Sequence, residues 1–303
     1  MSEGNTQAMQ SLTISAPAKV NLFLGVGTVR PDGYHAVHTV LHTLALGDTV
    51  TLTPANELAV SCDVDLGIPD QRNLAYRAAR AFSRAFGLDV LLDIAVTKRI
   101  PAGAGLGGGS SDAAAVLAGL AHWAELPLDD ARLLEVAASL GADVPFLIEG
   151  GAALMDGRGD RLVRRFTPIE AHVALVRPPV AVPTAEAYRA FDDAPEPSGD
   201  LRPIADALRI GDVEALAAGL ANNLLRASCT VAPQISEALE WLRAETGVLG
   251  STMAGSGSAV FAICACAGDA ANIAAAAEKR GWWGAATVTS GAGATVDEIE
   301  VLA

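Results

Sequence analysis

A glycine-rich stretch, P-A-G-A-G-L-G-G-G-S-S-D-A-A, occupies residues 101–114 and limits what this chain can fold into more than any other segment. Glycine loses more conformational entropy on folding than any other residue, so a dense cluster of glycines needs a structural reason. Before the stretch, apolar residues recur at every second position from Val90 to Val96, which predicts a half-buried strand. From Ser110 onward the apolar spacing is helical. The stretch is therefore expected to be a loop between a strand and a helix.

Three interpretations of this loop are open from the residues alone. A flexible linker is disfavoured because ordered elements are expected on both sides. A dinucleotide-binding turn fits G-x-G-x-x-G, but that pattern alone is a weak signal, and no second strand–helix–strand unit follows. The third is a phosphate cradle, in which glycines let phosphates approach the backbone N–H groups at the start of a helix. Ser110 and Ser111 would cap this helix. The absence of G-K-[ST] shows that it is not a Walker A loop.

The charge balance dictates how such a cradle would work. The chain has 303 residues, with 21 Lys and Arg against 35 Asp and Glu, for a net charge of −14. This excess of negative charge disfavours a role on nucleic acid or on an anionic membrane. A bound phosphate would therefore need its positive potential from the local backbone rather than from the protein surface.

The remaining composition predicts a cytoplasmic protein. No uninterrupted apolar stretch is long enough to span a bilayer. Residues 1–11 are polar, without the basic start and apolar core of a signal peptide, and we expect them to be a disordered tail. The chain has four cysteines and no C-x-x-C pair, which is typical of reduced, buried thiols.

The order of the expected elements predicts an α+β fold in two lobes. Strand patterns come first, helices follow, and the chain closes with strand, helix and strand. We expect an N-terminal domain at residues 12–163 and a C-terminal domain at residues 164–303. The expected helices are residues 73–86, 110–124, 130–140, 185–191, 204–208, 213–222, 233–245 and 269–280.

The glycine-rich stretch resembles the central ATP-binding motif of the GHMP kinases, P-x-x-x-G-L-G-x-G-S-S-x-A-A. Two more motifs of that family follow the same order: A-P-A-K-V-N-L-F-L at residues 16–24 and M-A-G-S-G-S-A-V-F at residues 253–261. Three ordered motifs are a strong signal, unlike any one alone. The resemblance implies the two-lobed GHMP kinase fold. Its N-terminal lobe is like domain 2 of ribosomal protein S5, its C-terminal lobe is ferredoxin-like, and the active site lies between them.

Two further segments, R-P-D-G-Y-H at residues 30–35 and G-A-D-V-P-F at residues 141–146, are similar to one branch of this family. That resemblance implies ATP-dependent phosphorylation of the 2-hydroxyl of 4-diphosphocytidyl-2-C-methyl-D-erythritol, in the non-mevalonate route to isoprenoid precursors. It implies ATP as co-substrate, Mg²⁺, and a monomer or homodimer. The alternatives are another GHMP small-molecule kinase, of the homoserine or mevalonate type, and a non-catalytic nucleotide-binding module.

Two residues are expected to be catalytic. Asp143 precedes Pro145, so its residue type alone favours a helix cap. The resemblance makes it the base that accepts the proton of the substrate hydroxyl. Lys19 stands alone in an apolar strand, where an exposed edge position is the usual explanation. The resemblance instead places its ammonium beside Asp143.

The resemblance also assigns the two substrate sites. Tyr34 and His35 would form the cytidine pocket, with Tyr188 as the opposing ring. A second glycine loop, residues 255–257 of the motif M-A-G-S-G-S-A-V-F, would close the active site near substrate and phosphate. The expected ATP-binding residues are Asn73, Lys98, Pro101, Ala102, Gly103, Ala104, Gly105, Leu106, Gly107, Gly108, Gly109, Ser110 and Ser111. The expected acceptor-binding residues are Asn21, Tyr34, His35, Thr184, Tyr188, Gly255, Ser256 and Gly257.

Metal ligands are harder to assign. His35, His38 and His42 are closely spaced but lack the H-E-x-x-H arrangement, so a zinc site is disfavoured, and His38 and His42 are expected to be ordinary sheet or helix residues. Mg²⁺ would be needed to neutralise ATP. No protein ligand for it can be placed from the sequence.

Overall fold

The structure is a computed structural model that describes residues 10–301. Residues 1–9 of the expected tail at residues 1–11 lie outside the described residues. Its last two residues, Gln10 and Ser11, already belong to strand β1 (Gln10–Val29). Ser11 Oγ donates a hydrogen bond to the carbonyl oxygen of Leu52 on the neighbouring strand, so the expected tail is too long by these two residues.

Two long strands organise the first half of the chain. β1 and β2 (His35–Pro54) pair antiparallel from Leu12 and Leu52 up to Val29 and His35. Gly33, with a φ of +81°, lies in the turn between them, and the Arg30 N–H donates to the Tyr34 carbonyl over 2.7 Å. A positive φ is easily adopted only by glycine, so the Asp-Gly pair sets this turn.

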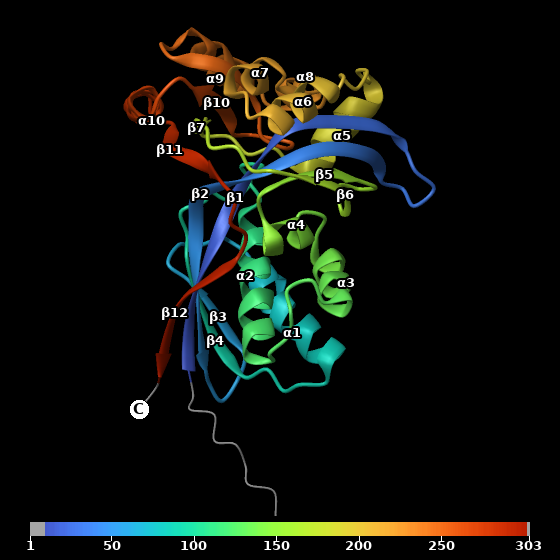
Figure 1. Cartoon of the computed structure of the whole chain (residues 1–303), viewed down its shortest axis with the longest axis vertical. Coiled ribbons are helices and arrows are strands. Elements are labelled where there is room, and N and C mark those ends of the chain that lie inside the picture. The colour runs from blue at the N-terminus through green and yellow to red at the C-terminus, as the bar shows by residue number, and fades with distance from the viewer. Residues whose placement is uncertain (1–9, 302–303) are drawn as a thin grey trace, which may run out of the picture.

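Helices α1 to α4 lie together on one side of this hairpin (Figure 1). The central helix is α2 (Gly108–Trp123), and every residue from Ser111 to Ala121 is buried. A Cβ atom on Gly119 would come within 2.6 Å of Leu52 Cδ1, so the close approach of α2 to β2 demands small residues. The other elements of this half are β3 (Ala59–Cys62), the 3₁₀ turn η1 (Asp70–Arg72), α1 (Leu74–Phe86), β4 (Leu92–Thr97), α3 (Ala131–Leu140), α4 (Val144–Glu149), β5 (Ala152–Asp156) and β6 (Arg161–Phe166).

The second half is built on four antiparallel strands in the order β11-β7-β10-β9. Alternate residues of β10 face two separate cores: Phe261 and Ile263 join one, and Val260 and Ala262 join the other. The elements are β7 (His172–Arg177), α5 (Thr184–Asp193), α6 (Arg202–Ile210), α7 (Val213–Ala218), β8 (Ala221–Asn222), α8 (Leu225–Val231), α9 (Gln234–Ala244), β9 (Val248–Met253), β10 (Val260–Cys264), α10 (Ala267–Lys279) and β11 (Trp283–Ser290).

The two halves share one sheet. β2 pairs with β11 through Leu44 and Thr289, and β8 pairs in parallel with β1 through Phe23 and Ala221. The last strand, β12 (Thr295–Val301), returns to pair with the first part of β1, and the two lie side by side at the bottom of Figure 1. The division into domains at residues 163 and 164 stays a prediction. The pairing of β12 places the carboxy-terminal strand on the sheet of the first half.

Most expected helices lie within a few residues of their observed bounds. The main exception is the helix expected at residues 213–222, which ends at Ala218 and gives way to the short strand β8. The elements that were not expected from the sequence are β3, η1, α4, β6, β8, α8 and β12.

Candidate active site

A large cavity opens between the two halves of the molecule. Its volume is about 1070 Å³, and both glycine loops line it together with residues of β1, β2 and α5. Of the site residues expected from the sequence, the cavity is lined by Lys19, Asn21, Tyr34, His35, Asn73, Lys98, Pro101, Ala102, Gly103, Ala104, Gly105, Leu106, Gly107, Gly108, Gly109, Ser110, Asp143, Thr184, Tyr188, Gly255 and Ser256.

The glycine-rich loop has the backbone of a phosphate cradle. Gly103, Gly105 and Gly107 have φ values of +67°, +77° and +81°, which other residues adopt only with strain. Helix α2 begins directly after Gly107, and the Ser111 N–H donates to the Gly107 carbonyl. The N–H groups of the preceding first turn have no partner inside the helix and form the positive end of its dipole. An anion in the cavity would meet them.

Ser110 and Ser111 do not cap this helix. The cap position is Gly107, and the helix starts earlier than expected because the glycines themselves enter its first turn. Ser111 is fully buried, and its Oγ donates to the carbonyl oxygen of Pro17 over 2.7 Å. This hydroxyl joins α2 to β1 and is not directed at the cavity.

Lys19 and Asp143 are brought together as expected. The Lys19 ammonium lies 3.4 Å from Asp143 Oδ2 and donates to Asn21 Oδ1 over 2.9 Å. Asn21 in turn donates to Thr39 Oγ1, and the Thr39 hydroxyl donates to the carbonyl oxygen of Phe23. This chain of hydrogen bonds fixes the direction of the ammonium. Thr39 was not expected as a site residue.

Asp143 occupies the cap position of α4, but its carboxylate makes no capping hydrogen bond. The side chain is 29% exposed while that of Lys19 is 5% exposed. The helix-cap role that residue type alone favoured is therefore wrong. The carboxylate is free to bind a group that enters the cavity.

The other end of the cavity is aromatic. The rings of His35 and Tyr188 lie in contact, with centroids 4.9 Å apart, and the His35 Nε2 atom lies 2.7 Å from Asp192 Oδ1. Because these two rings are in contact, no base can lie between them. The role of Tyr188 as the opposing ring of the cytidine pocket stays a prediction. Burial, together with the charge of Asp143, raises the pKa of Tyr188 to about 12. Tyr34 is 56% exposed beneath the Arg158 guanidinium.

The second glycine loop joins β9 to β10 and packs against the first. The Ala259 N–H donates to the Ala104 carbonyl over 3.0 Å, and a Cβ atom on Gly105 would overlap the carbonyl oxygen of Ala254. Ser256 Oγ lies 3.0 Å from Thr184 Oγ1, which ties the loop to the start of α5. The two loops therefore hold each other in place at the cavity wall.

Lys98 and Asn73 line the cavity but are already engaged by protein groups. Asn73 Oδ1 accepts from the Ala75 N–H and caps α1. Lys98 forms ion pairs with Asp48 and Asp112, which the sequence analysis did not identify. A signal for Asp112 was present, because it is the one charged residue in the alanine-rich segment that follows the glycines.

His38 and His42 are ordinary strand residues, as expected. His38 and His42 both lie in β2, and His42 is fully buried. Across residues 10–301 there is no group of three His, Cys, Asp or Glu side chains that could hold a metal ion. In the same part of the chain, no helix combines the length and the apolar character needed to cross a membrane.

Comparison with known proteins gives consistent matches. The model described as GHMP kinases N terminal domain matches residues 73–151, and that described as GHMP kinases C terminal matches residues 204–282. The 4-diphosphocytidyl-2-C-methyl-D-erythritol kinase of Pelotomaculum thermopropionicum is 41% identical over 87% of this chain and 93% of its own length. The enzyme of the same name from Geobacter metallireducens is 42% identical over 85% of this chain and 90% of its own length.

A solved structure agrees with these relatives. The crystal structure of a 4-(cytidine 5'-diphospho)-2C-methyl-D-erythritol kinase superposes with a TM-score of 0.76 at 36% identity, covering 92% of this chain and 99% of that one. The α+β fold expected from the sequence is confirmed. On the matched models, relatives and architecture, this chain belongs to the GHMP kinases.

Proposed function

We propose that this protein is an ATP-dependent kinase that phosphorylates the 2-hydroxyl of 4-diphosphocytidyl-2-C-methyl-D-erythritol. The observation that supports this most strongly is the identity of 41% and 42% to the two kinases of that name, which extends over more than four fifths of the chain. The cavity supports it independently, because one continuous space joins a phosphate cradle to a Lys–Asp pair.

The acceptor hydroxyl would bind between Asp143 and the end of the glycine-rich loop. Asp143 would accept the hydroxyl proton as the hydroxyl oxygen bonds to the γ-phosphorus of ATP. The bond from that phosphorus to the β–γ bridging oxygen would break, ADP would leave, and Asp143 would return its proton to solvent. Lys19, held by Asn21, would orient the reacting groups and balance the charge that builds up on the phosphoryl oxygens.

The phosphate chain of ATP would lie along the first turn of α2. Its charge would be met by the N–H groups of Gly108, Gly109 and Ser110, which line the cavity. Magnesium would be expected on the phosphate oxygens, since ATP-dependent phosphoryl transfer requires charge neutralisation there. The described residues offer no three-ligand site for it, so we assign it no protein ligand.

Acceptor specificity would come from the aromatic end of the cavity. Tyr34, His35 and Tyr188 offer the ring faces and polar edges that a cytosine base needs. A coupled assay of ADP release tests the proposal, with the cytidine-linked substrate, homoserine and mevalonate offered in turn. Turnover restricted to the cytidine-linked substrate supports it. A preference for homoserine or mevalonate contradicts it, and ATP binding without turnover on any of the three would favour the non-catalytic alternative.

We also propose that the protein acts in the cytoplasm as a monomer or homodimer. The low number of cysteines, four in 303 residues, supports a reducing compartment. Light scattering after gel filtration distinguishes the two assembly states.

A further inference from the structure

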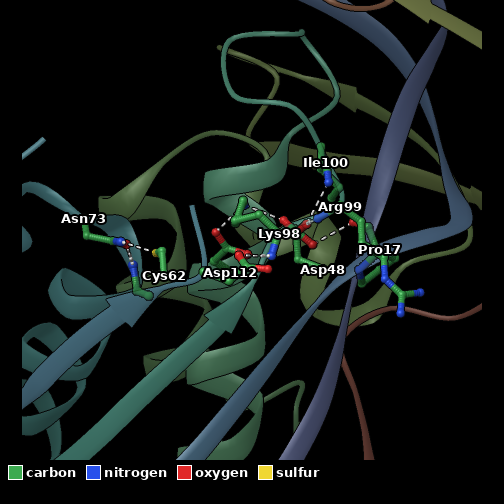
Figure 2. Close-up of polar contacts among 11 residues, drawn as sticks. Pro17, Asp48, Cys62, Asn73, Lys98, Arg99, Ile100 and Asp112 are labelled. Carbon is green, nitrogen blue, oxygen red and sulfur yellow. Dashed lines mark hydrogen bonds and ion pairs between the residues drawn. The ribbon is translucent and has the colours of Figure 1, made fainter. Parts of the chain in front are cut away.

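A buried cluster of three charged side chains lies beneath the glycine-rich loop. Lys98 Nζ lies 2.5 Å from Asp48 Oδ2 and 2.7 Å from Asp112 Oδ2. The side chains of Lys98, Asp48 and Asp112 are 7%, 0% and 3% exposed. Figure 2 shows Lys98 between the two carboxylates. If both carboxylates were ionised, one ammonium would face two negative charges in a site that is almost entirely buried.

The cluster connects the two ends of the loop. Asp48 Oδ1 accepts hydrogen bonds from the N–H groups of Arg99 and Ile100, over 2.6 and 2.8 Å, directly before the loop. Asp112 belongs to α2, directly after the loop. Lys98 bridges the two, and a Cβ atom on Gly108 would lie 3.4 Å from its ammonium nitrogen. The three side chains therefore set the distance between the segment that enters the phosphate cradle and the helix that leaves it.

One atom of this cluster lacks a partner. Asp112 Oδ1 is buried and accepts no hydrogen bond from any residue in the described part of the chain. An ionised carboxylate needs donors on both oxygens, so an orphaned Oδ1 is unfavourable for the charged form. A proton on Asp112 lessens this cost, because a neutral carboxyl group loses less free energy on burial than a carboxylate does, and Oδ2 still accepts from Lys98. The neutral acid also leaves the cluster with one ammonium and one carboxylate, so its charges balance.

Burial and the charge of Asp48 also favour the neutral form of Asp112, against the opposing charge of Lys98. Burial raises the pKa of Asp112 to about 7, with Lys98 opposing the rise and Asp48 adding to it. Burial acts against the charged form of Lys98, but Asp112 and Asp48 outweigh it and raise the Lys98 pKa, so this side chain stays an ammonium. Two more titratable groups lie nearby. The Asp63 carboxylate accepts a hydrogen bond from the Lys98 N–H, and burial raises the pKa of Cys62 on β3, with Asp112 adding to the rise.

We propose that Asp112 is a proton-dependent positioning residue for the nucleotide. In its neutral form it completes a charge-balanced clamp across the two ends of the glycine-rich loop. Loss of its proton puts an uncompensated negative charge beneath the cradle, where it opposes the phosphates and the positive end of the α2 dipole. This inference rests on the proposed function only in requiring that the loop binds ATP.

The Asp112→Asn variant tests the proposal, because asparagine has the shape of the neutral acid and cannot lose a proton. ATP binding to both proteins is measured by calorimetry from about pH 6 to about pH 8.5. The ATP Kd of the wild type should rise relative to that of Asp112→Asn by up to about tenfold between pH 6 and pH 8, as expected for a single proton with a pKa near 7. Near pH 6 the two proteins should bind ATP within about twofold of each other.

Asp129→Asn is the matched control, since it makes the same change at an exposed carboxylate outside the cavity lining. It should follow the wild-type curve, including the part due to titration of ATP itself. Parallel curves for the wild type and Asp112→Asn would overturn the proposal. A large loss of affinity in Asp112→Asn at pH 6 would also overturn it, because the charged form would then be the functional one.

A measurement without ligand separates this proposal from the proposed function. The difference infrared spectrum of wild type minus Asp112→Asn at pH 6 should contain the carbonyl band of a neutral carboxylic acid, and the band should vanish as the pH is raised. Its absence at pH 6 would overturn the proposal. If band and binding curves behave as expected while no acceptor is phosphorylated, the clamp stands and the proposed function does not.

Discussion

The Lys19 ammonium lies 3.4 Å from the Asp143 carboxylate, although the two residues come from different elements and from opposite sides of the glycine-rich loop in the sequence. Lys19 is fixed from behind by Asn21, and Asp143 is free of the capping bond that its position would allow. The pair combines a rigid cation with an available carboxylate. This is the arrangement that proton abstraction and phosphoryl transfer both require.

Asp143→Asn should abolish most turnover and leave the fold intact. The amide keeps the shape of the side chain but cannot accept the hydroxyl proton, so kcat should fall roughly a hundred- to ten-thousand-fold. ATP binding by calorimetry should change little, because the phosphate cradle is formed by other residues. Asp130→Asn serves as the control, since this carboxylate caps α3 and does not line the cavity. A kcat near the wild-type value in Asp143→Asn would exclude Asp143 as the base.

Gly105→Ala and Gly103→Ala form a matched pair of loop variants. Both glycines have a positive φ, so both substitutions strain the backbone by about 1 kcal/mol. Only Gly105 is also pressed against the second loop, where a Cβ atom would overlap the Ala254 carbonyl oxygen, whereas a Cβ atom on Gly103 meets nothing within 4 Å. Gly105→Ala should therefore raise KM for both ATP and acceptor several-fold, and Gly103→Ala should affect neither strongly. Steady-state kinetics checks this, and equal effects of the two would show that backbone strain alone matters.

Asp192→Asn should weaken acceptor binding alone. Asp192 holds His35 Nε2 at 2.7 Å, and this contact fixes the ring at the aromatic end of the cavity. Without the carboxylate, the imidazole loses its orientation and the KM for the acceptor should rise about tenfold, with the KM for ATP unchanged. The neighbouring Asp193, which makes no such contact and does not line the cavity, provides the control. A parallel rise in the KM for ATP and the KM for the acceptor would show that Asp192 does not act on acceptor binding alone.

Local sequence patterns were sufficient to predict the glycine-rich loop and the strand and helix on either side of it. Strict alternation predicted β4, and apolar residues at every fourth position predicted the helix that ends at Gly87. In the structure Gly87 adopts the left-handed conformation common at helix ends. β6 and β12 were missed for a physical reason. Both are exposed strands with charged residues, and each is ordered by pairing with a partner strand rather than by an apolar pattern of its own.

The site residues divide in the same way, into those that the sequence could identify and those that depend on contacts between separate elements. No local property distinguishes Lys19 or Asp143 as catalytic, and only their place in family motifs identified them. Asp48 carries no signal at all, because its partner Lys98 lies in a distant segment and the ion pair exists only after β2 and β4 have paired. The contact between Tyr188 and His35 was not expected either, because it exists only where helix α5 packs this tyrosine directly against the imidazole. Contacts of this kind depend on how separate elements pack.

His42 should make the stability of the protein depend on pH. It is fully buried, and burial lowers its pKa to about 4. Its Nδ1 atom lies 2.9 Å from the Thr43 carbonyl oxygen and its Nε2 atom 3.4 Å from the Ile169 N–H, so the neutral ring donates through the first and accepts through the second. Protonation would turn Nε2 into a donor that faces another donor.

The direction of this pH dependence follows from the pKa of His42 in the unfolded and the folded protein. The unfolded chain takes up a proton near pH 6.5, whereas the folded protein does so only near pH 4, so folding stability is full above pH 6.5 and is lost as the pH falls toward 4. Between pH 7 and pH 5 the free energy of unfolding should drop by about 2 kcal/mol from this residue. Urea unfolding of the wild type and of His42→Gln measures it, because glutamine can donate and accept without titrating. The variant should lose about 2 kcal/mol less than the wild type over this range. Carboxylates that also titrate affect both proteins alike, so equal losses would mean that His42 is charged in the folded state.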